Sequence, residues 1–420
     1  MQGLLMGVDL CDDYSQVSCL NPLTGETEAI TLTKEEISCL IPTVICKKKT
    51  EDTWFIGEEA YRRALVGEGI MVDKLVKLAG KEGSATIESV KYTAEELLYR
   101  FVAQLLAMAR EKYRTQAVDS LVFTVQTLTG DLLDMLVRIA ERCDVSRDRV
   151  RILSHTESFV YYVLSQPKDV WVNAVCMFDL TEEGLHYYEM RVVRGRKPQV
   201  AEARHERLEE GFDLNVLDSA SGEHMGDTIL TACAERILDR KVISSVFLTG
   251  KGFATTDWAS HFLQRVCYKR KVFAGQHVFA SGAAYVAGDS LRQESAYPFT
   301  VLCEGRIAAT VSIQARYEGR NERLVLADAG TNWYEARSSV ELIPDGTSVL
   351  ELAVSRIGVP THDRVRVDLS EFPQRPNKTT RIEVIVSFTA EDRMTIRVID
   401  RGFGELFPAS GRMIRRDISL

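Results

Sequence analysis

The feature that most constrains this fold is a motif that occurs twice: an apolar strand ending in an aspartate, a short polar turn, and a returning strand. The first copy covers residues 3–20 and carries Asp9, and the second covers 174–193 and carries Asp179. An almost wholly apolar run is typical of a strand buried on both faces, and an aspartate at a strand end is usually a turn former. Together the copies predict an internal duplication with two hairpins facing one cleft.

The segments after each hairpin repeat the order helix, strand, helix, strand, helix. The first half predicts these elements at 93–112, 121–126, 131–142, 150–153 and 157–164, after a strand at 26–32, an extended segment at 41–46 and a helix at 58–65. The second half predicts them at 225–238, 243–248, 257–266, 271–273 and 280–288. Thr93 and Glu96 form a capping-box pattern before the clearest helix. The repeated order indicates two related α/β lobes, 1–168 and 169–289.

Two segments are interpreted as surface features. Residues 67–88 are rich in Gly, Lys and Glu and indicate a compact surface excursion, and the basic run 412–416 indicates a solvated tail. From Tyr297 onward the apolar residues alternate with period two between turn signals, and no helical period occurs. The strands are predicted at 299–302, 307–315, 323–326, 339–342, 347–354, 364–368, 381–389 and 394–400. Residues 297–420 are therefore expected to form an all-β sandwich.

Charge and composition narrow the partners. The 420 residues carry a net charge of −8, which argues against non-specific binding to nucleic acid or an anionic membrane. No apolar run reaches the roughly 18 residues of a membrane span, and the N-terminus lacks the pattern of a signal peptide. We therefore expect a cytoplasmic protein with no nucleic-acid or membrane partner.

The nine cysteines are scattered without a CxxC pair, which is typical of small buried hydrophobic side chains and not of a disulfide or zinc framework. Cys11 is the exception because it falls in the first turn. A reactive thiol is conceivable there, but the acidic neighbours Asp12 and Asp13 are expected to raise its pKa and blunt it.

Several short segments, in the correct order, resemble the actin-like ATPase superfamily and, within it, the DnaK-type heat-shock 70-kDa chaperones. Residues 7–10 (GVDL) and 178–180 (FDL) resemble that family's two phosphate-loop strands, and 248–250 (LTG) its adenosine loop. Residues 122–125 with 151–153, and 278–284, resemble its connecting regions, and 380–384 with 394–400 its peptide-binding β-domain. The resemblance implies a two-lobed, ribonuclease-H-like duplicated ATPase fold followed by a β-sandwich.

The resemblance also implies a set of site residues. ATP or ADP with Mg²⁺ is the implied cofactor, with Asp9, Asp179 and Glu157 catalytic if the protein is active, and Asp9 and Asp179 as metal ligands. The implied cofactor-binding positions are Asp12, Asp13, Thr181, Glu182, Glu183, Gly250, Gly252 and Gly282. The family's catalytic glutamate aligns here with His155, two positions before Glu157, and its catalytic lysine has two candidates, Lys74 and Lys77.

Both phosphate turns depart from the family. Glycines and hydroxyl residues cradle phosphate there, whereas this chain has Cys11-Asp12-Asp13 and Thr181-Glu182-Glu183. A carboxylate about 6 Å from a phosphate charge costs roughly 2 to 3 kcal/mol at an effective dielectric of about 20. Four of them cost about as much as the ~8 kcal/mol of a micromolar site, unless a cation or outward-pointing side chains relieve the repulsion. The sequence therefore predicts a cleft that has lost tight ATP binding.

Three functions follow. The favoured one is a pseudo-ATPase scaffold whose β-domain or cleft binds a protein or extended peptide, without the family's helical lid and with a polar linker at 290–295. The second is a working ATP-dependent chaperone. The third is a sensor of a divalent cation or small ligand, because the acidic turns carry the hard oxygen ligands that Mg²⁺ and Ca²⁺ take. An equal alternative for those acidic residues is that they are solvated turn residues pointing outward.

Overall fold

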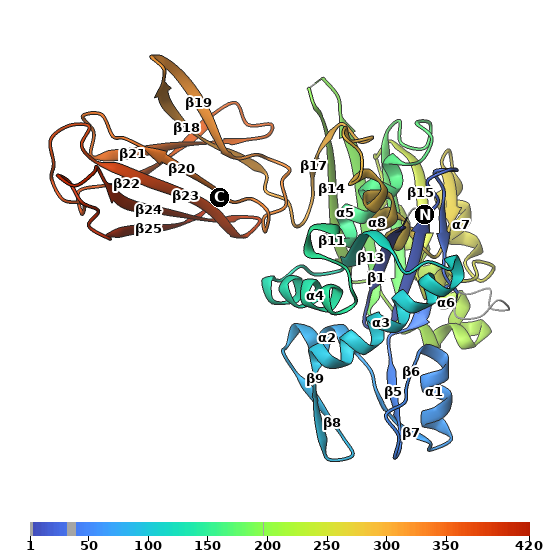
Figure 1. Ribbon diagram of the computed structural model, residues 1–420. Coiled ribbons are helices and arrows are strands. Elements are labelled where there is room, and N and C mark those ends of the chain that lie inside the picture. The colour runs from blue at the N-terminus through green and yellow to red at the C-terminus, as the bar shows by residue number, and fades with distance from the viewer. Residues whose placement is uncertain (1–2, 32–38, 196) are drawn as a thin grey trace. The chain divides into compact units, whose positions relative to one another are not determined.

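The computed structural model describes residues 3–31, 39–195 and 197–420, so Leu32 of the predicted strand 26–32 lies outside the described residues. The chain divides into two compact units, Met1–Phe299 and Thr300–Leu420. The first unit mixes helices with several sheets, and the second is built from strands (Figure 1). The expected combination of an α/β region with a β-rich C-terminal region is therefore confirmed.

The first large sheet of unit 1 has the order β11-β10-β1-β2-β3. Its strands are β1 (Leu4–Leu10), β2 (Tyr14–Leu20), β3 (Thr27–Ala29), β10 (Val118–Val125) and β11 (Val150–Ser154), and β4 (Ile41–Pro42) also pairs with β2. β1 runs antiparallel to β2 and parallel to β10, which in turn is parallel to β11. All seven residues of β1 are buried, as its apolar run predicts.

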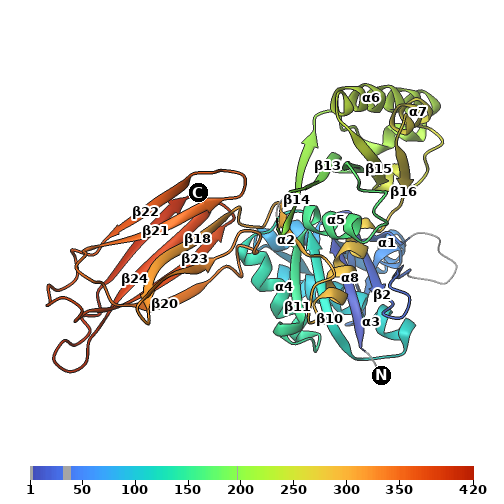
Figure 2. The ribbon, with the colours of Figure 1, turned by 90° about the horizontal axis from the view of Figure 1, so that it is seen from above.

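The second large sheet has the order β16-β15-β12-β13-β14 over the strands that lie within unit 1. They are β12 (Ala174–Thr181), β13 (Gly184–Val193), β14 (Gln199–Leu208), β15 (Ile243–Thr249) and β16 (Lys271–Ala274). β12 is antiparallel to β13 and parallel to β15, and β15 is parallel to β16. The two sheets therefore share one topology (Figure 2).

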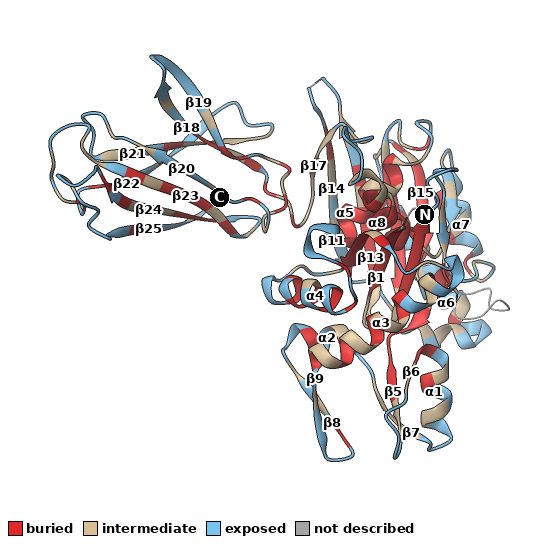
Figure 3. Cartoon of the chain, in the orientation of Figure 1, coloured by how far each residue is buried: buried red, intermediate tan, exposed pale blue. Residues whose placement is uncertain are grey.

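Helices cover these sheets and meet between them. They are α1 (Gly57–Leu65), α2 (Leu75–Gly80), α3 (Ala94–Tyr113), α4 (Gly130–Arg142), α5 (His155–Leu164), α6 (Ala220–Leu238), α7 (Ser260–Cys267) and α8 (Val278–Asp289), with 3₁₀ turns at Arg147–Arg149, Leu214–Asp218 and Lys251–Phe253. α5 and α8 follow β11 and β16 in the chain and pack against each other. Both helices are largely buried (Figure 3).

The predicted cap of α3 forms in part. The Thr93 side chain accepts a hydrogen bond from the Glu96 N–H at 3.2 Å. The Glu96 carboxylate pairs with Arg100 and Arg142 instead of reaching back to the helix start. The helix face predicted to be apolar is buried throughout, with Leu97, Leu98, Phe101, Val102, Leu105, Leu106 and Ala109 all in the core.

Residues 67–88 form a surface excursion, as predicted, because most of them are exposed or half-buried, and the excursion contains regular secondary structure. β7 (Gly69–Val72) pairs with β5 (Ile45–Lys48), which also pairs with β6 (Trp54–Ile56). The segment continues through α2 into a hairpin of β8 (Ser84–Ile87) and β9 (Val90–Thr93). The side chain of Lys74, at the start of α2, and the backbone N–H of Lys77, within α2, reach the first acidic turn.

Unit 2 contains two four-stranded antiparallel sheets, ordered β19-β18-β21-β22 and β20-β23-β24-β25. The strands of the two sheets are β18 (Ala309–Tyr317), β19 (Arg320–Ala327), β20 (Ser338–Leu342), β21 (Val349–Arg356), β22 (His362–Asp368), β23 (Arg381–Ala390), β24 (Arg393–Gly402) and β25 (Met413–Ser419), and β17 (Phe299–Leu302), which begins at the unit boundary, belongs to neither of them. Alternate residues of β21, β23 and β24 supply one shared core that includes Leu352, Val384 and Ile396.

Two strands were not predicted. Arg412, Arg415 and Arg416 of the basic run are exposed, as expected of a solvated surface, and residues 413–416 also lie in β25, which pairs with β24. Residues 199–208, for which no element was predicted, form β14, the third strand of its meander. Among the described helices, none is both long and apolar enough to cross a membrane.

Candidate functional site

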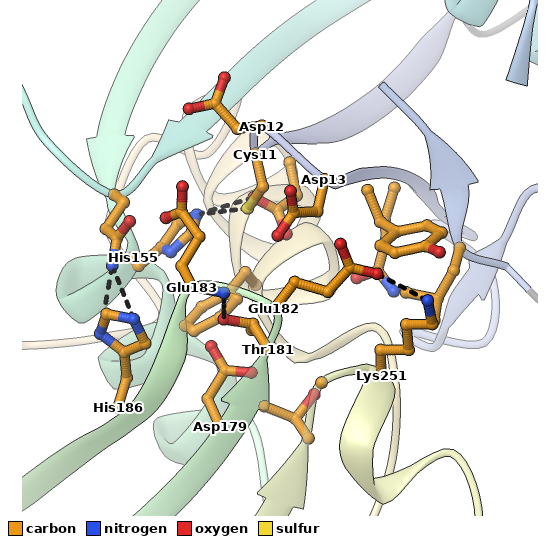
Figure 4. A pocket seen from close by; sticks show the side chains of 18 of the residues that line it. Cys11, Asp12, Asp13, His155, Asp179, Thr181, Glu182, Glu183, His186 and Lys251 are labelled. Carbon is orange, nitrogen blue, oxygen red and sulfur yellow. Dashed lines mark hydrogen bonds and ion pairs between the residues drawn. The ribbon is translucent and has the colours of Figure 1, made fainter. Parts of the chain in front are cut away.

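A small cavity of about 70 Å³ lies where β1 and β12 end. Carboxyl ends of parallel strands are the usual place for ligands in α/β sheets. The acidic turns after both strands line it, together with residues from both sheets and α8 (Figure 4). Its lining residues are Asp9, Cys11, Asp12, Asp13, Tyr14, Gln16, Leu40, Gln126, His155, Asp179, Thr181, Glu182, Glu183, His186, Thr249, Gly250, Lys251, Gln276 and Phe279.

The two aspartates occupy equivalent positions in the two sheets. Asp9 is paired in register with Gln16 of β2 and with Thr124 of β10. Asp179 is paired with His186 of β13 and with Thr249 of β15. Both carboxylates are buried and line the same cavity, which is the juxtaposition that the duplicated motif predicts.

Three different side chains converge beside Asp9. The Asp9 Oδ1 atom lies 2.8 Å from His155 Nε2, and the Cys11 Sγ atom lies 3.6 Å from Asp9 Oδ1 and 3.7 Å from His155 Nε2. Burial, followed by the nearby Asp9 charge, raises the pKa of the Cys11 thiol well above its usual value. The direction agrees with the prediction, but its charge component comes from Asp9, Asp179 and Glu183 instead of from Asp12 and Asp13.

This arrangement differs from a cysteine–histidine–aspartate catalytic triad. In a triad the carboxylate holds one ring nitrogen of the histidine while the nucleophile contacts the other. Here both Asp9 and Cys11 approach the same nitrogen, His155 Nε2. His155 Nε2 can therefore accept the Cys11 proton only when it is not donating a hydrogen bond to Asp9. For this reason the geometry does not favour covalent catalysis by Cys11.

Asp179 faces the cavity from the second sheet. Asp179 is 6% exposed, and its carboxylate makes no hydrogen bond or ion pair with any of the described residues. Burial raises the pKa of its carboxyl to about 7, although the nearby His155 acts in the opposite direction. The Asp179 oxygens are not fully enclosed by protein, so they face the open space of the cavity.

Lysines hold the acidic turns at the cavity mouth. Lys251 Nζ lies 2.6 Å from Glu182 Oε1, and Lys74 pairs with the Asp13 carboxylate. Asp12 accepts a hydrogen bond from the Lys77 backbone N–H at 2.8 Å. Repulsion among these carboxylates is thus partly relieved by cations that belong to the protein itself, and Lys74 and Lys77 serve here as partners of Asp13 and Asp12.

A pair of histidines borders the cavity on the side of the second sheet. His186 Nδ1 lies 2.9 Å from His205 Nε2, and Gln126 lies 3.2 Å from His186. Burial, with neighbouring His205, lowers the pKa of His186 to about 4. His186 therefore stays neutral at physiological pH and cannot serve as a cationic group for a phosphate.

The structure brings together eight of the residues that the resemblance implies: Asp9, Asp12, Asp13, Asp179, Thr181, Glu182, Glu183 and Gly250. Three others do not line the cavity. Glu157 is buried in the first turn of α5, Gly252 packs against Leu180 and Leu214, and Gly282 packs against the backbone of Ser158. The two glycines are therefore needed for close packing, whereas the cavity takes His155 in place of Glu157.

Several lining residues carried no sequence signal. Gln126, His186 and Gln276 lie in an ordinary strand and in loops where no local motif marks them, and Phe279 lies in the segment 278–284, whose resemblance to a connecting region gave it no site role. His155 and Lys251 follow the segments 151–153 and 248–250, which resemble family motifs. Gln16 and His186 are equivalent positions of the duplicated hairpin, because each pairs in register with the aspartate of its own hairpin. That register was the one signal that could have identified His186.

Comparison with protein-family models gives two matches. The model described as "Family of unknown function (DUF5716) C-terminal" matches residues 26–304, and the model described as "Domain of unknown function (DUF8552)" matches residues 306–420. The search of curated proteins returned no match to this chain. The boundary between the two matched segments falls a few residues after the boundary between the structural units. Because the first match covers well over half of the 420 residues, the chain belongs to the family of unknown function DUF5716.

Proposed function

We propose that this protein is a non-catalytic relative of the heat-shock 70-kDa chaperones, with an actin-like duplicated fold in unit 1 and a protein-binding or peptide-binding β-domain in unit 2. The observation that carries the proposal is the identical topology of the two large sheets. In each sheet an antiparallel hairpin has two parallel strands on one side and a third antiparallel strand on the other, and each sheet places one buried aspartate on the shared cavity. Chance pairing of unrelated sheets would not match both the strand order and the aspartate positions.

The cavity argues for a non-catalytic protein. The cavity that Asp9 and Asp179 line measures about 70 Å³, below the roughly 300–1,000 Å³ of typical ligand pockets, whereas a second pocket of about 730 Å³ shares only Glu182 and Glu183 with it. Lys251 and Glu182 form an ion pair at its mouth, and the Lys251 ammonium lies 5.1 Å from the centre of the Tyr14 ring. Nucleotide entry would therefore require these contacts to open as well as the acidic turns to accept phosphate.

The same contacts give less support to the two alternative functions, a working ATPase and a sensor of a divalent cation. A working ATPase needs hydrogen-bond donors or cations that can bind phosphate at the turns. Here the two lysines at the turns, Lys74 and Lys251, are already paired with carboxylates. A Mg²⁺ or Ca²⁺ sensor needs several free carboxylate oxygens. Here one oxygen each of Asp12, Asp13 and Glu182 is already engaged by the protein, and Lys74 and Lys251 place positive charge where a divalent cation would lie.

Calorimetric titration with ATP and ADP, each with and without Mg²⁺, tests the proposal. We expect no micromolar binding by the wild-type chain. Micromolar binding that disappears in Asp9→Ala would restore the ATPase hypothesis. The Asp12→Thr/Asp13→Thr variant should be titrated in parallel, because it restores hydroxyl groups to the first turn.

The β-domain offers strand edges for a partner. β19, β22, β20 and β25 are the edge strands of its two sheets. Proteins commonly protect open edges with charged residues, and β19, β22 and β25 each carry several. β20 carries one charged residue, Glu341, among its five residues. An extended peptide would therefore meet the least charge repulsion by adding as a strand beside β20.

Hydrogen exchange of the full chain can locate such a partner. A saturating extended apolar peptide should slow amide exchange in β20 and leave β25 unchanged, so β25 serves as the internal control. Protection confined to unit 1, or the absence of protection at any peptide concentration, would contradict peptide binding by the β-domain.

A further inference from the structure

We propose that Asp9 Oδ1, Cys11 Sγ and His155 Nε2 bind a transition-metal ion of the Zn²⁺ class at the floor of the cavity. The three atoms all lie within 4.8 Å of one another. They come from the end of β1, the turn after it and the start of α5, and Figure 4 labels two of the three residues, Cys11 and His155. The inference is independent of the proposed chaperone relationship, because it rests on these side chains and requires no nucleotide.

The separations fit tetrahedral coordination. With metal–ligand bonds of about 2.0–2.3 Å, tetrahedral angles place sulfur about 3.6 Å from the nitrogen and oxygen ligands. The observed separations from Cys11 Sγ are 3.7 Å to His155 Nε2 and 3.6 Å to Asp9 Oδ1. The third separation, 2.8 Å, is shorter than the roughly 3.4 Å expected for two metal ligands, because a hydrogen bond joins Asp9 and His155. A metal would replace that hydrogen bond after a shift of about half an ångström.

The elements that carry the three ligands are rigid. β1 and β11 lie on either side of β10 and run parallel to it. Asp9 and His155 therefore both lie at the carboxyl ends of these strands. The side chain of Ser154 caps α5 by accepting from the Glu157 N–H at 3.1 Å. The His155 ring stacks on Phe279 with centroids 4.1 Å apart, which fixes the plane of the ligating ring. Fixed ligands reduce the ordering cost of metal binding.

A second observation points to a cation. Asp179 is 6% exposed, faces the same cavity and makes no hydrogen bond or ion pair among the described residues. Because the Asp179 oxygens face the open space of the cavity, a positive charge there would find a carboxylate that no protein cation already neutralises. A bound metal would supply that charge and leave a coordination position directed into the cavity for water or for Asp179.

The donor set selects the metal class. Mg²⁺ and Ca²⁺ take oxygen ligands, whereas thiolate and imidazole favour Zn²⁺ and its neighbours in the first transition row. Coordination breaks the Cys11 S–H bond, forms the S–metal bond and releases the proton to solvent. Because Cys11 and His155 lie 144 positions apart, no short spacing pattern reveals the site in the sequence.

Co²⁺ titration of the reduced, chelator-treated full chain tests the site. We expect one Co²⁺ per chain with a thiolate-to-cobalt charge-transfer band, which excess Zn²⁺ abolishes. Cys11→Ser should remove the band, and His155→Gln should weaken Co²⁺ binding more than about tenfold. Cys267→Ser is the matched control, because Cys267 is exposed at the end of α7, and it should retain the band. Absence of the band in the wild type, or its survival in Cys11→Ser, would overturn the proposal.

A second readout does not depend on the folding of any variant. Alkylation of the wild-type chain, followed by mass spectrometry, reports each cysteine separately. Zn²⁺ should slow modification of Cys11 and leave that of Cys267 in the same molecule unchanged. Equal rates for Cys11 with and without Zn²⁺ would contradict coordination by its thiolate.

Discussion

Gly282 of α8 packs directly against the backbone of Ser158 in α5, so closely that a Cβ atom at position 282 would overlap the Ser158 carbonyl group. The contact joins the helices that follow the last parallel strands of the two sheets. The resemblance to heat-shock 70-kDa chaperones implies a cofactor-binding role for Gly282. Its position instead indicates a helix-packing role, since only a residue without a side chain permits this approach.

We expect Gly282→Ala to destabilise the protein by about 1–3 kcal/mol, because the added methyl group forces the two helices apart. In a helix without such crowding, alanine in place of glycine is favourable by roughly 0.5–1 kcal/mol. Gly80 of α2 is the matched control, because a Cβ there meets open space. Thermal and urea unfolding should show a lower stability for Gly282→Ala than for the wild type, and an equal or higher stability for Gly80→Ala. Equal stability of Gly282→Ala and the wild type would contradict the packing role.

Unit 2 depends on a buried ion pair between Arg375 and Asp400. Both Asp400 oxygens accept from the guanidinium at 2.8 Å, and the two side chains are 7% and 0% exposed. Removing one partner of such a pair leaves a buried charge, so Arg375→Ala should cost about 3–5 kcal/mol. Lys378→Ala breaks the exposed pair with Asp345 and should cost no more than about 1 kcal/mol. Amide hydrogen exchange in β24 measures both effects. Similar protection in the two variants would contradict the stabilising role of the buried Arg375–Asp400 pair.

The sequence predicted the class of the fold because its strongest patterns are local. The hairpins around Asp9 and Asp179, the α3 face and most strands of unit 2 have apolar periods that depend on nearby residues. β14 and β25 were missed because their exposed faces carry many charged side chains, as edge strands and meander ends often do. The strand β7 within the excursion 67–88 was not predicted, because it gains its stability by pairing with the distant β5.

The site was predictable only in part. The duplicated motif predicted that Asp9 and Asp179 would meet, since strand ends of matching sheets occupy matching places. The argument from four repelling carboxylates left out Lys251, which sits beside Glu182 only after β12 and β15 have paired. The contact of His155 with Asp9 likewise depends on strand order, which the spacing of residues does not encode.

His186 should make stability depend on pH. Burial, with nearby His205, His155 and Arg207, lowers its pKa from the ordinary 6.5 to about 4, so the unfolded chain binds a proton more readily. Stability contributed by neutral His186 is therefore fully present above about pH 6.5 and falls as the pH drops toward 4, by up to about 3 kcal/mol. Urea unfolding of wild type and His186→Gln between pH 4 and 7 should show a weaker pH dependence in the variant. His224→Gln is the control, since His224 is exposed on α6, and a pH profile unchanged by His186→Gln would contradict the assignment.

The paired carboxylates at the cavity mouth should limit nucleotide binding. Asp13 and Glu182 hold Lys74 and Lys251, so neutralising both carboxylates frees two cations for phosphate and removes two repelling charges. We expect Asp13→Asn/Glu182→Gln to bind ATP or inorganic triphosphate at least about tenfold more tightly than the wild type. Glu202→Gln is the control, because Glu202 pairs with the exposed Arg191 and does not line the cavity. Calorimetry at two salt concentrations measures the gain, which should shrink at high salt because it is electrostatic. No gain in the double variant would mean that the cavity of about 70 Å³, and not its charge, excludes the nucleotide.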